Sequence, residues 1–277
     1  NEFFVAKLNA NHTWDWVTLG GGFNHYVLSI SINSFDNIVV SGKYQISSSQ
    51  NIYIGSTSLP YSHQTFIASI DNSGNWQWAT TIGYPSSTVE ISGIVSDSNG
   101  NSIIFGKYSG SEITLNGISG SLNLEYDQYS NNWQRSKAFV AKITSGGIWV
   151  WASQSTNNVE VYANDIQIDE NNDLYITGAF QRLSSSGNTV TFGSHSLSTS
   201  SNGYAHMYVA KLSDSGDWQW AKQFGDDTGT SNGYQVINSP GNNILYHNNQ
   251  LFVTTTYTGT LSFYDANMPD VSANYYG

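Results

Sequence analysis

Apolar and polar residues alternate with a period of two along most of the chain. Residues 208–212 (YVAKL) and 174–180 (LYITGAF) show the pattern, and Asn, Asp, Ser and Gly separate such segments. β-branched and aromatic residues are frequent in these segments, and no convincing helical period interrupts them. The pattern predicts an all-β protein of short antiparallel strands joined by tight turns.

A strand–turn–strand unit occurs four times. It reads FVAKLNANHTWDWV from Phe4, FIASIDNSGNWQWA from Phe66, FVAKITSGGIWVWA from Phe139 and YVAKLSDSGDWQWA from Tyr208. An apolar hairpin ending near a glycine and a short alternating segment recur with it; in the last copy Thr255 replaces the glycine. Four copies in 277 residues give a repeat of about 69 residues. Repetition at this length predicts stacked or radially arranged modules.

Four all-β modules of about four strands each predict a β-propeller, with residues 1–277 as one domain. We expect repeat units at about 4–65, 66–138, 139–207 and 208–277, the terminal unit being divided between the chain ends. A four-bladed ring forms if the N-terminal hairpin completes the last blade and so removes unpaired strand edges. The same edges can instead pair between molecules, head to tail, or belong to a longer array. The sequence leaves these alternatives open.

A Trp-x-Trp motif forms the second strand of each unit. Its indoles are Trp14, Trp16, Trp76, Trp78, Trp149, Trp151, Trp218 and Trp220. The residue between them varies, and strand alternation predicts that both indoles of a pair share one face. Burying an indole removes about 200 Å² from water. We therefore interpret these side chains as packing between modules, with a sugar-stacking platform as the alternative.

Composition excludes several classes of function. Only 10% of the residues are charged and the formal net charge is −11, whereas nucleic-acid binding requires clustered Lys and Arg. Without cysteine there is no disulfide, thiolate nucleophile or cysteine-based zinc site. We expect no membrane span and a processed or excerpted chain. Low charge, abundant Tyr, Asn and Ser, and a glycosylation sequon at Asn11 favour an extracellular or cell-surface location.

Several stretches resemble a known family of repeats. DENNDLYITGAF, TFGSHSL, MYVAKL and DWQWAKQFG resemble the SBBP-type β-propeller repeats of large exported bacterial and archaeal surface proteins. The resemblance covers nearly the whole chain. It implies an extracellular propeller. The family supplies no catalytic residues that could be assigned to positions of this sequence.

No catalytic constellation stands out in the sequence. Propeller enzymes that handle acidic sugars gather several arginines, and this chain has only Arg135 and Arg182. The six histidines lack metal-ligand spacing, and no nucleophile elbow or phosphate-binding glycine loop occurs. A carboxylate pair brought together by the fold is the alternative that spacing leaves open. We expect a protein that is not an enzyme and has no cofactor.

One segment contains candidate ligands for a calcium ion. Asp169, Asn171 and Asp173 have the alternate oxygen spacing of calcium loops, but the Glu at the twelfth position is missing. Ordinary turn chemistry is the competing interpretation.

The connection from Leu122 to Phe139 departs from the repeat. It concentrates aromatic and cationic groups, notably Tyr126, Tyr129, Trp133 and Arg135. Loops on rigid scaffolds often carry binding residues, so these four are candidates for contact with a glycan or a partner protein. The competing interpretation is that the loop covers a strand edge.

These observations predict a non-enzymatic extracellular propeller that acts as a structural or self-assembly module of a cell-surface or filamentous assembly. Its partners would be copies of itself or other surface proteins. The alternative is a carbohydrate-binding adhesin or lectin-like module.

Overall fold

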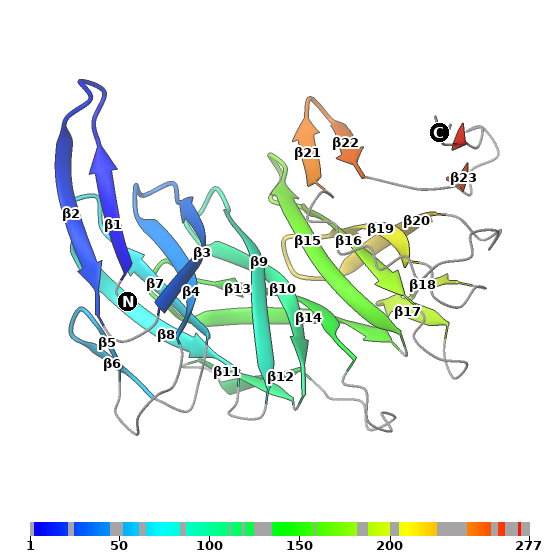
Figure 1. Ribbon diagram of the computed structural model, residues 1–277, viewed down its shortest axis with the longest axis horizontal. Helices are drawn as coiled ribbons and strands as arrows, with labels where there is room; N and C mark the ends of the chain where they lie inside the picture. Colours follow the sequence, from blue (N-terminus) through cyan, green and yellow to red (C-terminus); the bar gives the residue numbers. More distant parts are fainter. Residues whose placement is uncertain are drawn as a thin grey trace, which may run out of the picture. The chain divides into compact units, whose positions relative to one another are not determined.

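The computed structural model confirms the all-β prediction: its described residues form antiparallel sheets and contain no helix. The described residues are 3–21, 25–44, 52–60, 65–83, 87–110, 112–117, 120–124, 135–157, 159–181, 188–199, 205–225, 243–255, 260–263 and 271–272. The chain divides into two compact units, residues 1–126 with 140–152, and residues 127–139 with 153–277. Figure 1 labels the strands of both units.

The first unit opens with an isolated hairpin, which we call the N-terminal half-blade: β1 (Phe3–Leu8) and β2 (Trp14–Gly20). A four-stranded sheet follows, the first blade, with the order β3 (His25–Ile32), β4 (Ile38–Tyr44), β7 (Thr65–Ile70), β8 (Trp76–Ile82). A small hairpin, β5 (Ile52–Ile54) and β6 (Thr57–Leu59), lies between β4 and β7 in the sequence.

The second blade repeats this order of strands. It consists of β9 (Thr88–Ser96), β10 (Ser102–Ser109), β13 (Lys137–Ile143) and β14 (Trp149–Asn157). Its small hairpin is β11 (Ile113–Gly117) with β12 (Gly120–Leu124).

The third blade lies in the second unit. Its strands are β15 (Glu160–Ile168), β16 (Leu174–Gln181), β19 (Ala205–Leu212) and β20 (Trp218–Phe224). Its small hairpin is β17 (Thr189–Phe192) with β18 (His195–Ser198), and β17 also pairs with the end of β14. Another isolated hairpin, the C-terminal half-blade, comprises β21 (Asn243–His247) and β22 (Gln250–Thr254), and β23 (Thr260–Leu261) pairs with β24 (Val271–Ser272).

Each blade is made of two hairpins, a leading one such as β3–β4 and a trailing one such as β7–β8, joined edge to edge. The sequence units predicted at 4–65 and 66–138 begin at a trailing hairpin, so each structural blade straddles two of them. The N-terminal half-blade corresponds to a trailing hairpin and the C-terminal half-blade to a leading one. Antiparallel blades of four strands are the sheets of a propeller.

A glycine in the second strand of each leading hairpin allows two strands to approach closely. Gly178 pairs with Tyr208 of the neighbouring strand, and a Cβ atom there would lie 2.5 Å from the Tyr208 hydroxyl oxygen and collide with the carbonyl oxygen of Tyr162. Gly42 pairs with Phe66 in the same way, and a Cβ atom would lie 2.6 Å from that ring. Glycine is therefore required here by space alone.

The C-terminal half-blade has Thr255 at the position of this glycine. The leading hairpins of the three blades each contain a register shift close to the glycine, and their pairing continues beyond it. In β21–β22 the described pairing runs without a shift from His247↔Gln250 to Asn243↔Thr254. Thr255 follows directly, at the position of the glycine.

We predict that Gly178→Ala lowers the free energy of unfolding by about 2 kcal/mol or more, because the added methyl group overpacks the contact between β15, β16 and β19. Gly146→Ala is the matched control, since its nearest non-neighbouring atom would lie 3.8 Å away. Urea unfolding followed by tryptophan fluorescence measures both. Equal stability of the two variants would contradict this steric explanation.

Candidate functional site

The two indoles of a Trp-x-Trp motif face opposite sides of the blade, so our prediction of a shared face is wrong. In the first blade Trp78 pairs with Ser69, whereas Trp76 pairs with Ile70. The register therefore shifts at Gln77, which is the extra residue of a bulge. Because paired residues share a face, the bulge turns one indole to each side. The same shift occurs at Trp14 and Trp16 and at Trp218 and Trp220.

The opposite orientation lets one strand contact two neighbouring hairpins. Trp76 Nε1 donates to the carbonyl oxygen of Leu19 in the preceding hairpin (3.0 Å). Trp78 Nε1 donates to the carbonyl oxygen of Ser145 in the following hairpin (2.7 Å). The indoles therefore supply hydrogen bonds as well as apolar area between successive modules.

The turns of the trailing hairpins β7–β8 and β13–β14 receive the second indole of the preceding motif. Gly74 (φ 87°) lies against Trp16, and Gly147 (φ 82°) lies against Trp78; at both glycines an added Cβ atom would lie 2.8 Å from the indole Cδ2. Glycine fits at both positions for two reasons. It adopts the positive φ that other residues disfavour, and the nearby indole leaves no room for a Cβ atom. In the N-terminal half-blade His12 occupies this position, with φ 62°.

The turn carboxylate of the second blade forms a buried ion pair. Lys142 Nζ lies 2.7 Å from Asp97 Oδ2, and both side chains are almost inaccessible to solvent. Asp97 also accepts hydrogen bonds from the backbone of Asn99 and from the backbone and side chain of Asn101. Burial would raise the pKa of Asp97, but the hydrogen bonds from Lys142 and Asn101 hold it below its ordinary value.

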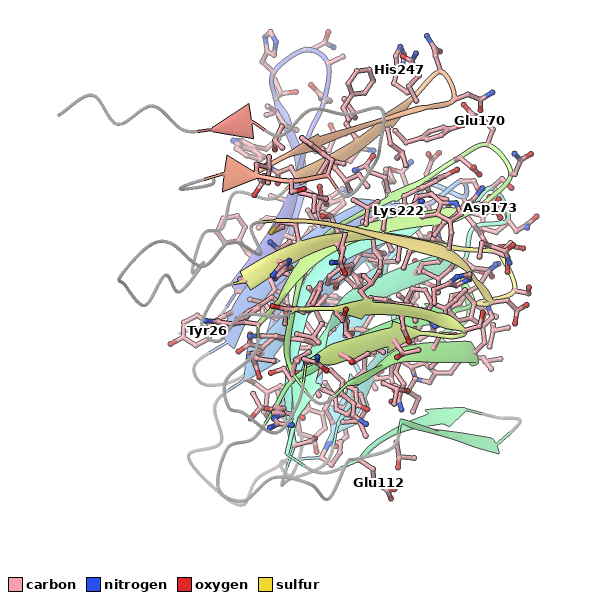
Figure 2. The ribbon with its side chains drawn as sticks, turned by 90° about the vertical axis from the view of Figure 1, so that its right-hand side faces the viewer. Tyr26, Glu112, Glu170, Asp173, Lys222 and His247 are labelled. Atoms are coloured by element: carbon pink, nitrogen blue, oxygen red, sulfur yellow. The ribbon has the colours of Figure 1, made fainter. Side chains whose placement is uncertain are left out.

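A lysine also lies against the turn that predicted a calcium site. Asp169 Oδ1 accepts hydrogen bonds from the backbone amides of Asn171 and Asp173, both at 2.9 Å. Lys211 Nζ lies 2.8 Å from Asp173 Oδ2 and 4.0 Å from Asp169 Oδ2. Figure 2 shows Asp173 at this turn, near Glu170. These contacts are ordinary turn chemistry with an ammonium as the cation, and calcium binding stays a prediction.

One of the four candidates in the connection from Leu122 to Phe139 lies within the described residues. Tyr126, Tyr129 and Trp133 lie outside the described residues, whereas Arg135 is half-buried beside the start of β13. Asn11, the glycosylation candidate, is exposed at the turn between β1 and β2.

Within the described ranges, no group of three or more His, Asp or Glu side chains could hold a metal. The same part of the chain has no helix with the length and apolar content of a membrane span.

The N-terminal half-blade exposes a face that the complete blades bury. Phe4 is 65% exposed, whereas Phe66, Phe139 and Tyr208 at the equivalent position are each 0% exposed. Phe4 pairs with the exposed Leu19 of β2, which lies on the same side. Other residues of this face are Ala6, Leu8, Trp14 and Val17. The opposite face, with Phe3 and Val5, packs against the first blade.

The C-terminal half-blade is covered on one face in the same manner. Ile244 and Tyr246 belong to the core cluster of the third blade, and the Ile244 amide donates to Asp165 Oδ2 (3.0 Å). The opposite face carries Leu245 and Phe252, which pair across the hairpin and are both more than half exposed. The residues equivalent to Phe252, such as Val39, are buried in the complete blades.

Each of these faces is a candidate site within its own unit, and its apolar side chains form no polar motif that the sequence could have revealed. The signals that could have found them are the glycines of the complete blades, which His12 and Thr255 replace in these two hairpins.

Four-stranded antiparallel blades that contact each other through paired indoles define a propeller-type repeat protein. No family model matches the chain. An uncharacterised WD repeat-containing protein of Acanthamoeba polyphaga mimivirus is 24% identical over 277 residues, which cover 90% of this chain. The chain spans 19% of the length of that relative. A WD repeat-containing relative supports a propeller-type repeat, and the finer SBBP-type resemblance stays a prediction.

A solved structure is also similar to the chain. A protein of unknown function from Bacteroides caccae superimposes with a TM-score of 0.28 at 11% identity. The match covers 79% of this chain and 89% of that one. At this score the likeness carries no argument about the fold.

We predict that Trp78→Phe lowers the free energy of unfolding by about 1–2 kcal/mol, because the Ser145 carbonyl loses its donor and the indole contact with Gly147 is reduced. Trp14→Phe should change it by less than about 0.5 kcal/mol, since Trp14 is 70% exposed. Denaturant unfolding of both variants provides the comparison. A larger loss at Trp14 would overturn the assignment of Trp78 as a contact between modules.

Asp97→Asn should lower the free energy of unfolding at pH 7 by about 3 kcal/mol, because Lys142 remains buried without its counter-charge. The pKa of Asp97 in the folded protein is lower than its unfolded value of about 3.9. The ionised carboxylate therefore stabilises the folded protein above pH 3.9, and this stabilisation is lost as the pH falls through the folded pKa. The difference between wild type and variant should therefore shrink at low pH. Asp71→Asn, in an exposed turn, is the control. A pH-independent difference would argue against the ion pair as its cause.

Proposed function

We propose that the chain is a non-enzymatic, extracellular propeller-type module that associates with copies of itself in a cell-surface or filamentous assembly. The observation that carries this proposal is the exposure of Phe4 in the N-terminal half-blade, at a position that every complete blade buries. Exposed apolar faces at the two half-blades are the type of surface by which proteins associate.

The charged side chains of the described residues support a structural function. Lys142 is paired with Asp97, and Lys211 is paired with the turn carboxylates of the third blade. Glu90 lies between two lysines, Lys107 (3.4 Å) and Lys43 (3.5 Å). Burial would raise the pKa of Glu90, but both lysines hold it below its ordinary value. These groups stabilise turns and strands, and we therefore propose a function that requires neither catalysis nor a cofactor.

An extracellular location rests on the composition and on the sequon. Asn11 is exposed at a hairpin turn, where an oligosaccharide could be attached. Glycan binding by the loop from Leu122 to Phe139 stays a prediction, since its three aromatic residues lie outside the described residues.

The proposed function predicts concentration-dependent association of the purified chain. Phe4→Ser combined with Leu19→Ser should weaken it by roughly 100-fold, since each buried apolar side chain contributes about 1.5–3 kcal/mol. Tyr53→Ser, on the small hairpin β5–β6, removes a similarly exposed aromatic ring and is the matched control. Sedimentation velocity over a concentration series measures all three. A wild-type chain that stays monomeric throughout would contradict the proposed function.

A further inference from the structure

We propose that Trp220, Tyr175 and Tyr246 form a redox relay that moves an oxidising equivalent from the third blade to the surface of the C-terminal half-blade. The relay protects this part of the core against one-electron oxidants such as peroxyl or carbonate radicals. All three residues lie in the second compact unit. The inference goes beyond the proposed function, because it does not depend on association between copies.

A row of side chains across the third blade brings two of the rings together. Tyr175 of β16 pairs with Lys211 of β19, and Lys211 pairs with Trp220 of β20. Because paired residues share a face, the three side chains lie on one side of the sheet. The ring centroids of Tyr175 and Trp220 are 6.2 Å apart, with an interplanar angle of 54°. Ring pairs at this separation are in contact, which is close enough for an electron to pass between them.

The C-terminal half-blade supplies the third ring. Tyr246 of β21 stacks on Tyr175, with centroids 5.3 Å apart and an interplanar angle of 14°. Tyr175 is 7% exposed, whereas Tyr246 is half-buried and its hydroxyl lies beside the exposed side chains of Glu170 and Asn249. The three rings therefore form a continuous path from β20 to the surface.

The path begins in an apolar cluster that oxidation would damage. Trp220 packs against a core cluster that contains Tyr175 and Met207, and Met207 is 2% exposed. Oxygen added to an indole or a thioether places a polar group among apolar side chains and disrupts their packing. Moving the oxidising equivalent away from this cluster before oxygen is added preserves the packing.

Each tyrosine has a carboxylate that can take its proton. The Tyr175 hydroxyl donates to Asp169 Oδ2 (3.1 Å). Two acceptors lie near the Tyr246 hydroxyl, Glu170 Oε2 (3.0 Å) and Asn249 Oδ1 (2.7 Å). The phenol has one proton, and of these two groups only the carboxylate can take it up near neutral pH. Burial raises the pKa of both tyrosines, so both phenols are neutral at pH 7. Their oxidation is therefore favourable when the proton leaves with the electron.

The transfer is balanced in electrons and protons. The oxidant removes one electron from the Trp220 indole. Tyr175 returns an electron to the indole and passes its hydroxyl proton to Asp169. Tyr246 then reduces Tyr175, which recovers its proton from Asp169. The proton of Tyr246 moves to Glu170 in the same step. A small reductant in solution, such as ascorbate, finally returns one electron to Tyr246, which takes its proton back from Glu170.

Lys211 gives the relay a direction. Its Nζ lies 5.0 Å from the centre of the Tyr175 ring. A positive charge beside a ring makes the removal of an electron from that ring less favourable. The radical is therefore more stable at the outer ring, Tyr246, than at Tyr175.

The fold of a blade does not require this set of side chains. The corresponding row in the first blade consists of Val39, Ser69 and Trp78. An aliphatic side chain is therefore compatible with the position of Tyr175, and a small hydroxyl side chain with the position of Lys211. Packing alone explains the rings, but it does not explain why both phenols meet carboxylates.

Photo-oxidation followed by peptide mass spectrometry tests the relay. A photogenerated ruthenium(III) complex is the one-electron oxidant, and oxygen addition to Trp220 is measured in the purified chain. Tyr246→Phe keeps the ring and its packing but removes the hydroxyl proton, so we expect oxidation of Trp220 to rise severalfold. Glu170→Gln removes the proton acceptor and should raise it likewise. Tyr53→Phe, with a ring that is 57% exposed on the β5–β6 hairpin, is the matched control and should leave Trp220 oxidation unchanged.

The variants separate the relay from simple shielding of the indole. Unchanged oxidation of Trp220 in Tyr246→Phe overturns the relay, as does an equal rise in Tyr53→Phe. A rise in Tyr246→Phe without one in Glu170→Gln also overturns it, because proton transfer to Glu170 is part of the step. Circular dichroism checks that each variant folds. In the wild-type chain, electron paramagnetic resonance after rapid freezing should detect a tyrosyl radical, and its absence overturns the relay even where a variant fails to fold.

Discussion

Each blade of this protein has apolar side chains on both faces, so both faces need a neighbouring layer. The third strands show the constraint most clearly, because every residue of β7 and β13 is buried. Apolar surface exposed to water costs free energy in proportion to its area. Stacking blade on blade satisfies this requirement within the chain. Among the described residues, Phe4 and Phe252 are exposed apolar side chains whose counterparts in the complete blades are buried.

Local backbone features make the stacking possible. The bulge at Gln77 directs Trp76 to the preceding hairpin and Trp78 to the following one, so the same strand contributes to two interfaces. Glycines such as Gly74 and Gly178 supply the space that the aromatic rings require. The buried pair of Asp97 and Lys142 links the turn of a leading hairpin to the trailing hairpin of the same blade. These features are spaced along the repeat, and each complete blade depends on several of them together.

Much of this architecture could be predicted from the sequence. The alternation of apolar and polar residues and the four copies of the motif can be recognised from the residue types alone. The strands, the turns and the modules could be predicted in this way. The orientation of Trp76 relative to Trp78 could not be predicted, because side chains stop alternating between the two faces wherever a bulge inserts a residue such as Gln77. The candidate site was missed for a related reason. Phe4 belongs to the same apolar alternation as Phe66 in the sequence, and only the structure shows that Phe4 is exposed whereas Phe66 is buried.

The replacement of glycine by Thr255 and by His12 has a consequence for how such a molecule can change over time. Inside the stack, a contact that depends on glycine tolerates no side chain, so substitutions there are selected against by stability. In the N-terminal and C-terminal half-blades the same positions carry larger residues, His12 and Thr255. Substitutions are therefore less constrained at these two hairpins than at the glycines of the complete blades. Repeats with nearly identical interiors can in this way acquire hairpins with different surfaces.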